Sequence, residues 1–180
     1  MSDPVKIEEL NPAQASSIKL NYSYLTDSYY DFERKIVESG WQFQLNLKKL
    51  DRPIEKSSNS TLFEPYVERA KVFQACINNR PIGYLQIGHE TWINRARVWD
   101  LLIFPEFRKQ NAGTELIKLA VSEAKKWSAR SLVLETQSCN TPAIRFYLKN
   151  GFEIIGFDSN HYSNEDIQKK EIRIEFGLNL

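Results

Sequence analysis

VWDLLIFPEFRKQNAGTEL, residues 98–116, predicts a strand that runs through a short loop into a helix. After Thr114 the apolar side chains recur at helical spacing, at Leu116, Ala120, Ala124 and Trp127. A helix N-terminus presents unpaired backbone N–H groups and the positive end of the helix dipole, and Arg108 adds a positive charge before it. The stretch predicts either a phosphate-binding loop or an ordinary left-handed turn before a helix.

The loop pattern Arg108-x-x-Asn111-x-Gly113 resembles the acyl-CoA-binding motif of the GNAT N-acetyltransferases, Arg/Gln-x-x-Gly-x-Gly/Ala. Asn111 stands where the family usually has glycine, and Lys109 stands where a second glycine is common. Asparagine tolerates a positive φ, so the turn can still form, although its side chain would crowd a phosphate. The resemblance implies that the coenzyme A pyrophosphate is bound by Arg108, Lys109, Gln110, Asn111, Ala112, Gly113 and Thr114.

A second motif, LVLETQSCNTPAIRFYLKNGF at residues 132–152, follows at the distance that the same family shows. It predicts a strand, a short loop, and a helix with Thr141 as N-cap and Pro142 at the first helical position, ending at Gly151. It resembles the GNAT segment Leu-Glu-x…Asn-x-x-Ala-x-x-Phe-Tyr-x-x-x-Gly-Phe. With two ordered motifs, the chain is identified as a member of the GNAT family.

Within that family, residues 70–180 are similar to the streptothricin acetyltransferases, and the first 65 residues only loosely so. The similarity lies in Trp92-Ile-Asn94-Arg…Asp100, Leu134-Glu-Thr-Gln137 and Phe146-Tyr147. It implies an acetyl-CoA-dependent N-acetyltransferase that acts on a small cationic amine, such as a streptothricin-like antibiotic, and hence antibiotic resistance. Two alternatives stay open: acetylation of a protein, polyamine or amino sugar, and a GNAT-fold binding or regulatory module that has lost catalysis, which Lys109 and Asn111 suggest.

The resemblance also assigns roles in coenzyme binding and in proton transfer. The backbone of Leu101, Leu102 and Ile103 is expected to pair with pantetheine like an added strand, and Asn140 to bind pantetheine or orient a water molecule. Tyr147 resembles the general acid that protonates the coenzyme A sulfur, because a thiolate leaving group benefits from a proton. Its alternative interpretation is a core aromatic residue.

Asp100 and Glu135 are the candidates for the general base or for binding the cationic acceptor. Both lie on expected central strands, where a carboxylate is costly to bury without a partner. The alternative is a structural carboxylate that bonds to backbone groups or to an arginine such as Arg97 or Arg145. Weaker candidates are His89, Glu90, Asp158, His161 and Tyr162.

Composition favours a small globular enzyme. The 180 residues are 42% hydrophobic and 26% charged, with a net charge of +1. We expect one domain over residues 1–180, and neither nucleic acid nor a membrane as partner.

The family resemblance implies acetyl-CoA as cosubstrate. Cys76, Cys139 and the two histidines have no metal-ligand spacing, so no metal is expected. No signal pattern opens the chain, which favours a cytoplasmic protein. The partners considered are a small-molecule amine and a second copy in a homodimer.

The expected fold class is α/β: the GNAT (acyl-CoA N-acyltransferase) fold, a mixed central sheet splayed in the middle with helices on both faces. Strands are expected at residues 5–10, 70–77, 82–88, 96–103, 131–136, 153–157 and 172–176, and helices at 12–38, from Thr114 and from Pro142. Residues 51–60 are expected to form a linker, and the serine-rich stretch at residues 57–61 within and after it is expected to be a surface loop inside the domain.

Overall fold

The computed structural model describes residues 4–180, which form two compact units. The first unit contains the segment up to Tyr22, residues 57–134 and the last three residues, and the second contains residues 23–56 and 135–177. Each unit therefore combines segments that lie far apart in the sequence. The single domain over residues 1–180 stays a prediction.

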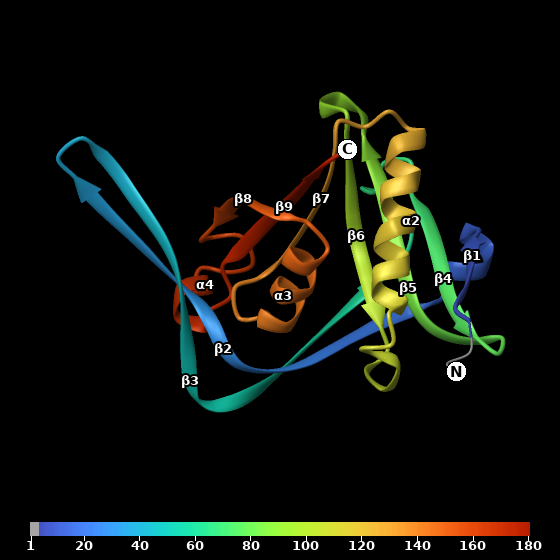
Figure 1. The fold of residues 1–180 in the computed structure, drawn as a ribbon, viewed down its shortest axis with the longest axis horizontal. Coiled ribbons are helices and arrows are strands. Elements are labelled where there is room, and N and C mark those ends of the chain that lie inside the picture. Colours follow the sequence, from blue (N-terminus) through green and yellow to red (C-terminus); the bar gives the residue numbers. More distant parts are fainter. Residues whose placement is uncertain (1–3) are drawn as a thin grey trace. The chain divides into compact units, whose positions relative to one another are not determined.

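A mixed sheet of seven strands, in the order β1-β4-β5-β6-β7-β9-β8, confirms the expected α/β class (Figure 1). Antiparallel pairing joins β1, β4, β5 and β6, whereas β6 and β7 are parallel and β8 and β9 antiparallel. The elements are β1 (Lys6–Leu10), α1 (Pro12–Ala15), β2 (Lys19–Val37), β3 (Gly40–Thr61), β4 (Lys71–Ile77), β5 (Arg80–Glu90), β6 (Arg95–Ile103), α2 (Ala112–Lys126), β7 (Ser131–Gln137), α3 (Thr141–Lys149), β8 (Glu153–Asp158), α4 (Asp166–Lys169) and β9 (Arg173–Asn179).

The β4–β5–β6 meander of the first unit was predicted from sequence. Asn78 and Asn79 connect β4 to β5 with φ values of 51° and 61°, a left-handed conformation that asparagine tolerates. In the next pairing Asp100 lies opposite Gln86, but Val98 lies opposite Ile87, so β6 carries an additional residue and forms a bulge. Parallel pairing of β6 and β7 joins Ala96 to Leu132 and Arg97 to Val133. The expected splay further along these strands stays a prediction.

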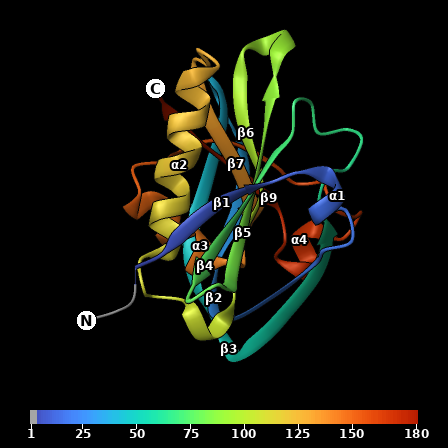
Figure 2. The same ribbon diagram turned by 90° about the vertical axis from the view of Figure 1, so that its right-hand side faces the viewer.

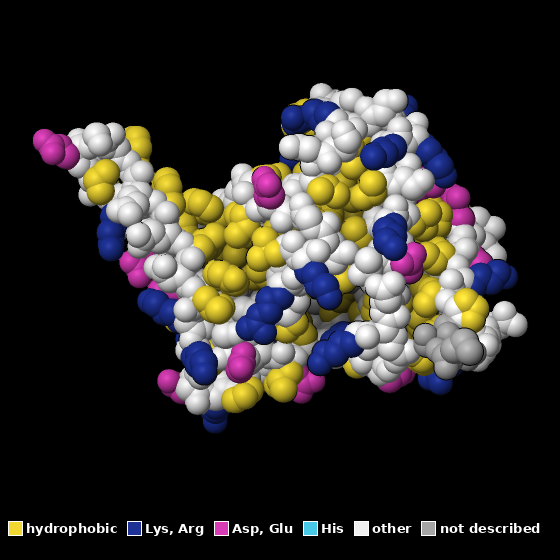
Figure 3. Space-filling view, in the orientation of Figure 1, with side chains coloured by type: hydrophobic (Ala, Val, Ile, Leu, Met, Phe, Trp, Pro, Cys, Tyr) yellow, Lys and Arg dark blue, Asp and Glu magenta, His cyan; other side chains and the backbone are white. Residues whose placement is uncertain are grey.

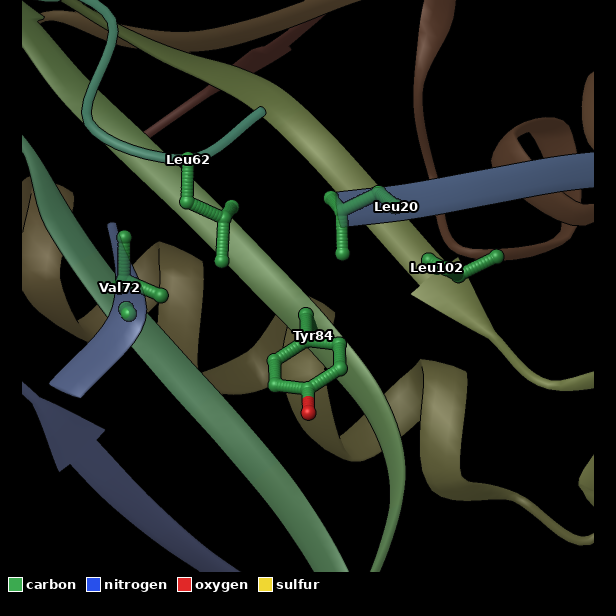
Figure 4. Packing of buried hydrophobic residues seen from close by; sticks show 6 residues of the cluster. Leu20, Leu62, Val72, Tyr84 and Leu102 are labelled. Atoms are coloured by element: carbon green, nitrogen blue, oxygen red, sulfur yellow. The ribbon is translucent and has the colours of Figure 1, made fainter. Parts of the chain in front are cut away.

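Helices and chain segments cover both faces of the strands in the first unit. Helix α2 packs on β5 and β6, and its buried residues follow the predicted apolar face. Figure 2 shows α2 and the short α1 on opposite sides of these strands. A hydrophobic cluster joins Ala15, Leu20, Leu62, Val72, Tyr84 and Leu102 (Figure 4). The start of β2 and the end of β3 thus pack on the same sheet as α1.

Two expectations about residues 12–61 were wrong. Only α1 is helical between residues 12 and 38, and β2 (Lys19–Val37) occupies most of the rest. The physical reason is composition, because tyrosine and threonine favour an extended chain, and the buried side chains Leu20, Thr26 and Ser28 are separated by even numbers of residues. The expected linker at 51–60 lies inside β3, in a two-stranded ribbon whose edges tolerate Pro53.

The second unit contains α3, α4, β8 and most of β9, together with the hairpin formed by the end of β2 and the start of β3. Its fully buried side chains include Ile144, Phe152, Ile174 and Phe176. Helix α3 begins one residue earlier than predicted, because Asn140 and not Thr141 is the N-cap. The Asn140 side-chain oxygen accepts a hydrogen bond from the Ala143 N–H at 3.3 Å. Helix α4 was not predicted, since four residues give too short a periodic pattern.

Candidate active site

One edge of β6 carries the backbone groups expected to pair with pantetheine. The N–H of Phe104 donates to the Ile82 carbonyl at 2.9 Å, so it points toward β5. Backbone direction alternates along a strand, and therefore the N–H groups of Leu101 and Ile103 point away from β5, whereas that of Leu102 points toward it. The Leu102 side chain is also buried in the core. Of the three predicted residues, only Leu101 and Ile103 direct their backbone N–H groups away from β5, where a ligand could accept from them.

The loop after β6 places its charges and its turn at the start of α2. The Nε of Arg108 donates to the Ile103 carbonyl at 3.0 Å, which fixes the guanidinium beside the strand end. Lys109 and Asn111 both have positive φ, 62° and 69°, as the missing family glycines would. The sequence alternative of a left-handed turn is therefore correct as a description of the backbone, and it is compatible with an anion site.

The N-terminus of α2 is not capped by its own N-cap side chain in the described part of the chain. The Asn111 amide donates instead to the Glu115 carboxylate at 3.1 Å. Gln110 donates to the Glu106 carbonyl at 3.2 Å, on the loop side. Because the first N–H groups of a helix have no acceptor within it, those that follow Asn111, from Ala112 to Thr114, provide donors for an anion.

Asp100 lies in a saturated hydrogen-bond network of the first unit. Its carboxylate accepts from the Tyr22 hydroxyl at 3.0 Å and from the Gln86 amide at 2.9 Å. The Gln86 oxygen in turn accepts from the Phe63 N–H at 2.6 Å. Burial raises the pKa of Asp100 from its ordinary value, and these hydrogen bonds oppose that effect. This geometry favours the structural interpretation of Asp100 over a role as base.

Glu135, in the second unit, has charged and polar partners and is only half-buried. Its carboxylate forms an ion pair with Arg173, accepts from the Tyr162 hydroxyl at 3.3 Å, and lies 3.9 Å from the Nε2 of His161. The suggested arginine partners were wrong for this group, because Arg97 pairs with Glu90 and Arg145 donates to Ser28. Glu135 thus belongs to a polar cluster that also contains two of the weaker candidates.

Tyr147 is packed among aromatic rings and keeps a hydroxyl without a hydrogen-bond partner among residues 4–180. The ring lies 5.6 Å from Phe176 and 6.1 Å from Phe152, centroid to centroid. Burial and the negative charge of Glu135 raise the pKa of Tyr147 to about 12. The phenol is therefore protonated at neutral pH. The ring packs as the core interpretation expects, and the role of Tyr147 as general acid stays a prediction.

Asn140 uses its side chain to fix the start of α3. Besides capping Ala143, its amide donates to the Thr136 hydroxyl at 3.0 Å and so links the helix to β7. A role toward pantetheine stays a prediction.

The other candidates have structural partners. His89 is buried, stacks on Trp127 at 5.4 Å and bonds to Asn94. Glu90 pairs with both Arg95 and Arg97. Within residues 4–180 no group of three or more His, Cys, Asp or Glu side chains could hold a metal ion. Nor does any helix in that range have the length and apolar character needed to cross a membrane.

Each unit therefore brings together part of the predicted set. The first holds the strand edge, the loop with Arg108 and Asp100, and the second holds Glu135, Asn140 and Tyr147. Sequence reasoning missed Arg173 as the partner of Glu135. The available signal was the alternation Arg173, Glu175 on the last predicted strand, where charged residues alternate with the buried Ile172, Ile174 and Phe176.

Comparison with known proteins gives one consistent result. The chain is 35% identical over 101 residues, 55% of its length, to streptothricin acetyltransferase A of Bacillus subtilis, and covers 58% of that protein. The chain spans about half the length of the curated relatives it matches. Its structure is similar to nourseothricin acetyltransferase, with a TM-score of 0.78 and 25% identity over 97% of this chain and 98% of the other.

A protein of Bacillus anthracis strain Ames, solved in complex with acetyl coenzyme A, has the same fold, with a TM-score of 0.72 and 21% identity over 100% of this chain and 99% of the other. The sequence of residues 36–152 matches the acetyltransferase (GNAT) family. This match covers more than half of the chain and includes both the loop at Arg108 and the helix that carries Tyr147. The protein belongs to the GNAT acetyltransferase family.

Proposed function

We propose that the protein transfers the acetyl group of acetyl-CoA to a primary amine of a small cationic acceptor, with a streptothricin-type antibiotic as first candidate. The observation that carries the proposal is the arrangement, within one unit, of the Leu101 and Ile103 N–H groups that point away from β5, the Arg108 guanidinium and the N-terminus of α2. Such an arrangement suits a ligand that has an extended amide-bearing arm and a pyrophosphate.

The coenzyme would be held by backbone groups more than by side chains. The Leu101 and Ile103 N–H groups would donate to carbonyls of the extended arm, and the N–H groups from Ala112 to Thr114, with Arg108, to the pyrophosphate. Asn111 has the positive φ that a glycine would supply, and its amide is bonded to Glu115. The loop therefore keeps the backbone needed for binding, which supports an enzyme over a module that has lost its ligand.

The reaction is direct attack of an amine on a thioester. The amine nitrogen forms a bond to the acetyl carbon, the carbon–sulfur bond breaks, and the sulfur leaves as a thiolate. Tyr147 would give its proton to this thiolate, since its raised pKa of about 12 keeps the phenol protonated until that step. The acylated nitrogen would then release its remaining extra proton, which restores the Tyr147 phenol and leaves a neutral amide. The amine must first lose a proton, because an ordinary alkylamine is mostly protonated at neutral pH. Glu135 or a water molecule beside it would receive that proton.

The acceptor is expected to be cationic because of the polar cluster around Glu135. Glu135 and Glu175 both contact Arg173, and Asp158 lies 3.8 Å from His161. The carboxylates of Glu135 and Asp158 would attract a polycation to this cluster. The similarity to a streptothricin acetyltransferase and to a nourseothricin acetyltransferase supports the same choice.

Removing the positive charge at the loop is expected to weaken acetyl-CoA binding. Arg108→Gln should raise the Kd for acetyl-CoA about tenfold, since a charge-assisted hydrogen bond contributes about 1.5–3 kcal/mol and part of it is screened here. Titration calorimetry measures the effect. Arg130→Gln is the matched control, because Arg130 is also exposed and also donates its Nε to a backbone carbonyl, that of Ile93, but follows the other end of α2. Equal affinities for the two variants would contradict the proposed loop, and no binding by the unaltered protein would contradict the coenzyme itself.

Neutralising Glu135 is expected to affect the acceptor and not the coenzyme. Glu135→Gln should raise the KM for a cationic amine about tenfold or more with the KM for acetyl-CoA unchanged, and added salt should reduce the difference. Coenzyme thiol release with streptothricin, polyamines, aminoglycosides and lysine peptides gives the measurement. Asp100→Asn is the comparison. It replaces one carboxylate oxygen that accepts a hydrogen bond, so the melting temperature should fall while the KM for the amine changes little. A protein that acetylates only neutral amines would rule out the cationic acceptor.

A further inference from the structure

The hairpin of β2 and β3 in the second unit is an amphipathic ribbon. Along β3 the apolar residues Trp41, Phe43 and Leu47 occupy odd positions, whereas Gln42, Gln44 and Lys48 occupy even ones, and alternate residues of a strand face opposite sides. Lys48 pairs with Asp31 at 2.5 Å and with Glu33 at 3.6 Å, so the polar face satisfies its own charges. On the apolar face the rings of Phe32 and Phe43 stack at 6.1 Å.

The second unit covers only part of this apolar face. Phe157 of β8 contacts both phenylalanines, at 4.7 Å and 5.2 Å between ring centroids. Closer to the tip, Ile36 is 85% exposed and Trp41 71%. Within the unit, the hairpin tip projects beyond α3, α4 and β8 (Figure 1), and hydrophobic side chains follow the hairpin and its base (Figure 3). An apolar face of this kind, projecting into solvent, requires a covering surface.

We propose that this face is the interface of a homodimer, in which the hairpin of each copy lies against the hairpin and β8 of the other. The face consists of Ile36, Trp41, Phe43, Leu47, Ile154, Ile155 and Phe157, all of them exposed. From their exposed fractions, these side chains present on the order of 900 Å² of apolar surface, close to the ~800 Å² that each partner buries in a stable interface.

A second copy fits this surface better than an unrelated partner does. In a two-fold dimer the same patch meets itself, so the matching apolar surface is supplied without any further protein. The exposed tryptophan, phenylalanines and isoleucines have the composition of an interface core, and the charged pairs of Asp31, Glu33 and Lys48 lie on the other face. The proposal does not depend on which amine is acetylated.

The mass of the protein in solution tests the proposal. Light scattering after gel filtration, from 1 to 100 μM as an order-of-magnitude range, is expected to give twice the chain mass of 21.0 kDa. Trp41→Glu, alone and with Ile36→Glu, should raise the dimer dissociation constant about 30-fold or more, as loss of a central aromatic side chain does. Gln42→Glu is the matched control, since it adds the same charge at the adjacent position on the polar face and should leave the mass doubled.

Each other outcome contradicts the dimer. A mass of one chain at the highest concentration for the unaltered protein overturns it, whatever the variants do, and so does a doubled mass that Ile36→Glu with Trp41→Glu leaves intact while circular dichroism shows native folding. Binding of a monomer to phosphatidylcholine and phosphatidylglycerol vesicles would assign the face to lipid instead.

Discussion

Tyr147→Phe is expected to lower kcat by roughly 10²- to 10⁴-fold and to leave the affinity for acetyl-CoA nearly unchanged. The substitution removes one hydroxyl and keeps the ring that contacts Phe152 and Phe176. That hydroxyl has no partner among residues 4–180, so its loss leaves no buried group unsatisfied and should change the melting temperature little. Steady-state kinetics with saturating amine, together with a binding titration, separates the two effects.

Tyr84→Phe is the matched control for this result. Tyr84 is also a buried tyrosine, but it lies in the hydrophobic cluster with Leu20 and Leu102. Removal of its hydroxyl should therefore leave kcat within a few-fold of the original value. Because the pKa of Tyr147 is about 12, the phenol stays protonated across the usual assay range, and a rise of kcat between pH 6 and 9 would report the amine or the base. Normal turnover by Tyr147→Phe would leave this residue a packing role only.

Gly83→Ala is expected to destabilise the protein by about 1–3 kcal/mol, a fall in melting temperature of roughly 2–4 °C for each kcal/mol in a chain of this size. A Cβ at position 83 would overlap the Leu102 carbonyl oxygen and would lie 2.6 Å from the Ile103 Cδ1 and 3.1 Å from its Cα. Backbone atoms cannot move aside as the end of a side chain can, so β6 must shift. Since Leu101 and Ile103 are the proposed donors to the coenzyme, acetyl-CoA should also bind more weakly.

Gly156→Ala provides the comparison in the second unit. A Cβ there meets only the end of the Glu175 side chain, at 3.9 Å, and the melting temperature should stay within about 1 °C. Thermal unfolding followed by circular dichroism, with and without acetyl-CoA, measures both variants. A Gly83→Ala protein as stable as the original would contradict this prediction, because it would show that β5 and β6 can move apart without loss of stability.

Local patterns were sufficient where neighbouring residues decide the structure. The loop at Arg108 to Gly113 and the helix after it could be predicted, because a left-handed turn and a 3.6-residue apolar period are both properties of a short stretch. The Asn78-Asn79 hairpin and the helix that carries Tyr147 follow for the same reason. The family assignment also came from sequence, since two motifs in fixed order carry it, and the match at residues 36–152 confirms it.

Tertiary structure decided what depends on residues distant in the chain. The tyrosine-rich segment after Leu20 forms a strand and not a helix because β3 (Gly40–Thr61) pairs with it in a two-stranded sheet. The pairing of Glu135 with Arg173, and the saturation of Asp100 by Tyr22 and Gln86, likewise join residues from different strands. Sequence showed that both carboxylates needed partners, because burying a charge is costly, but only the fold determined which partners they have.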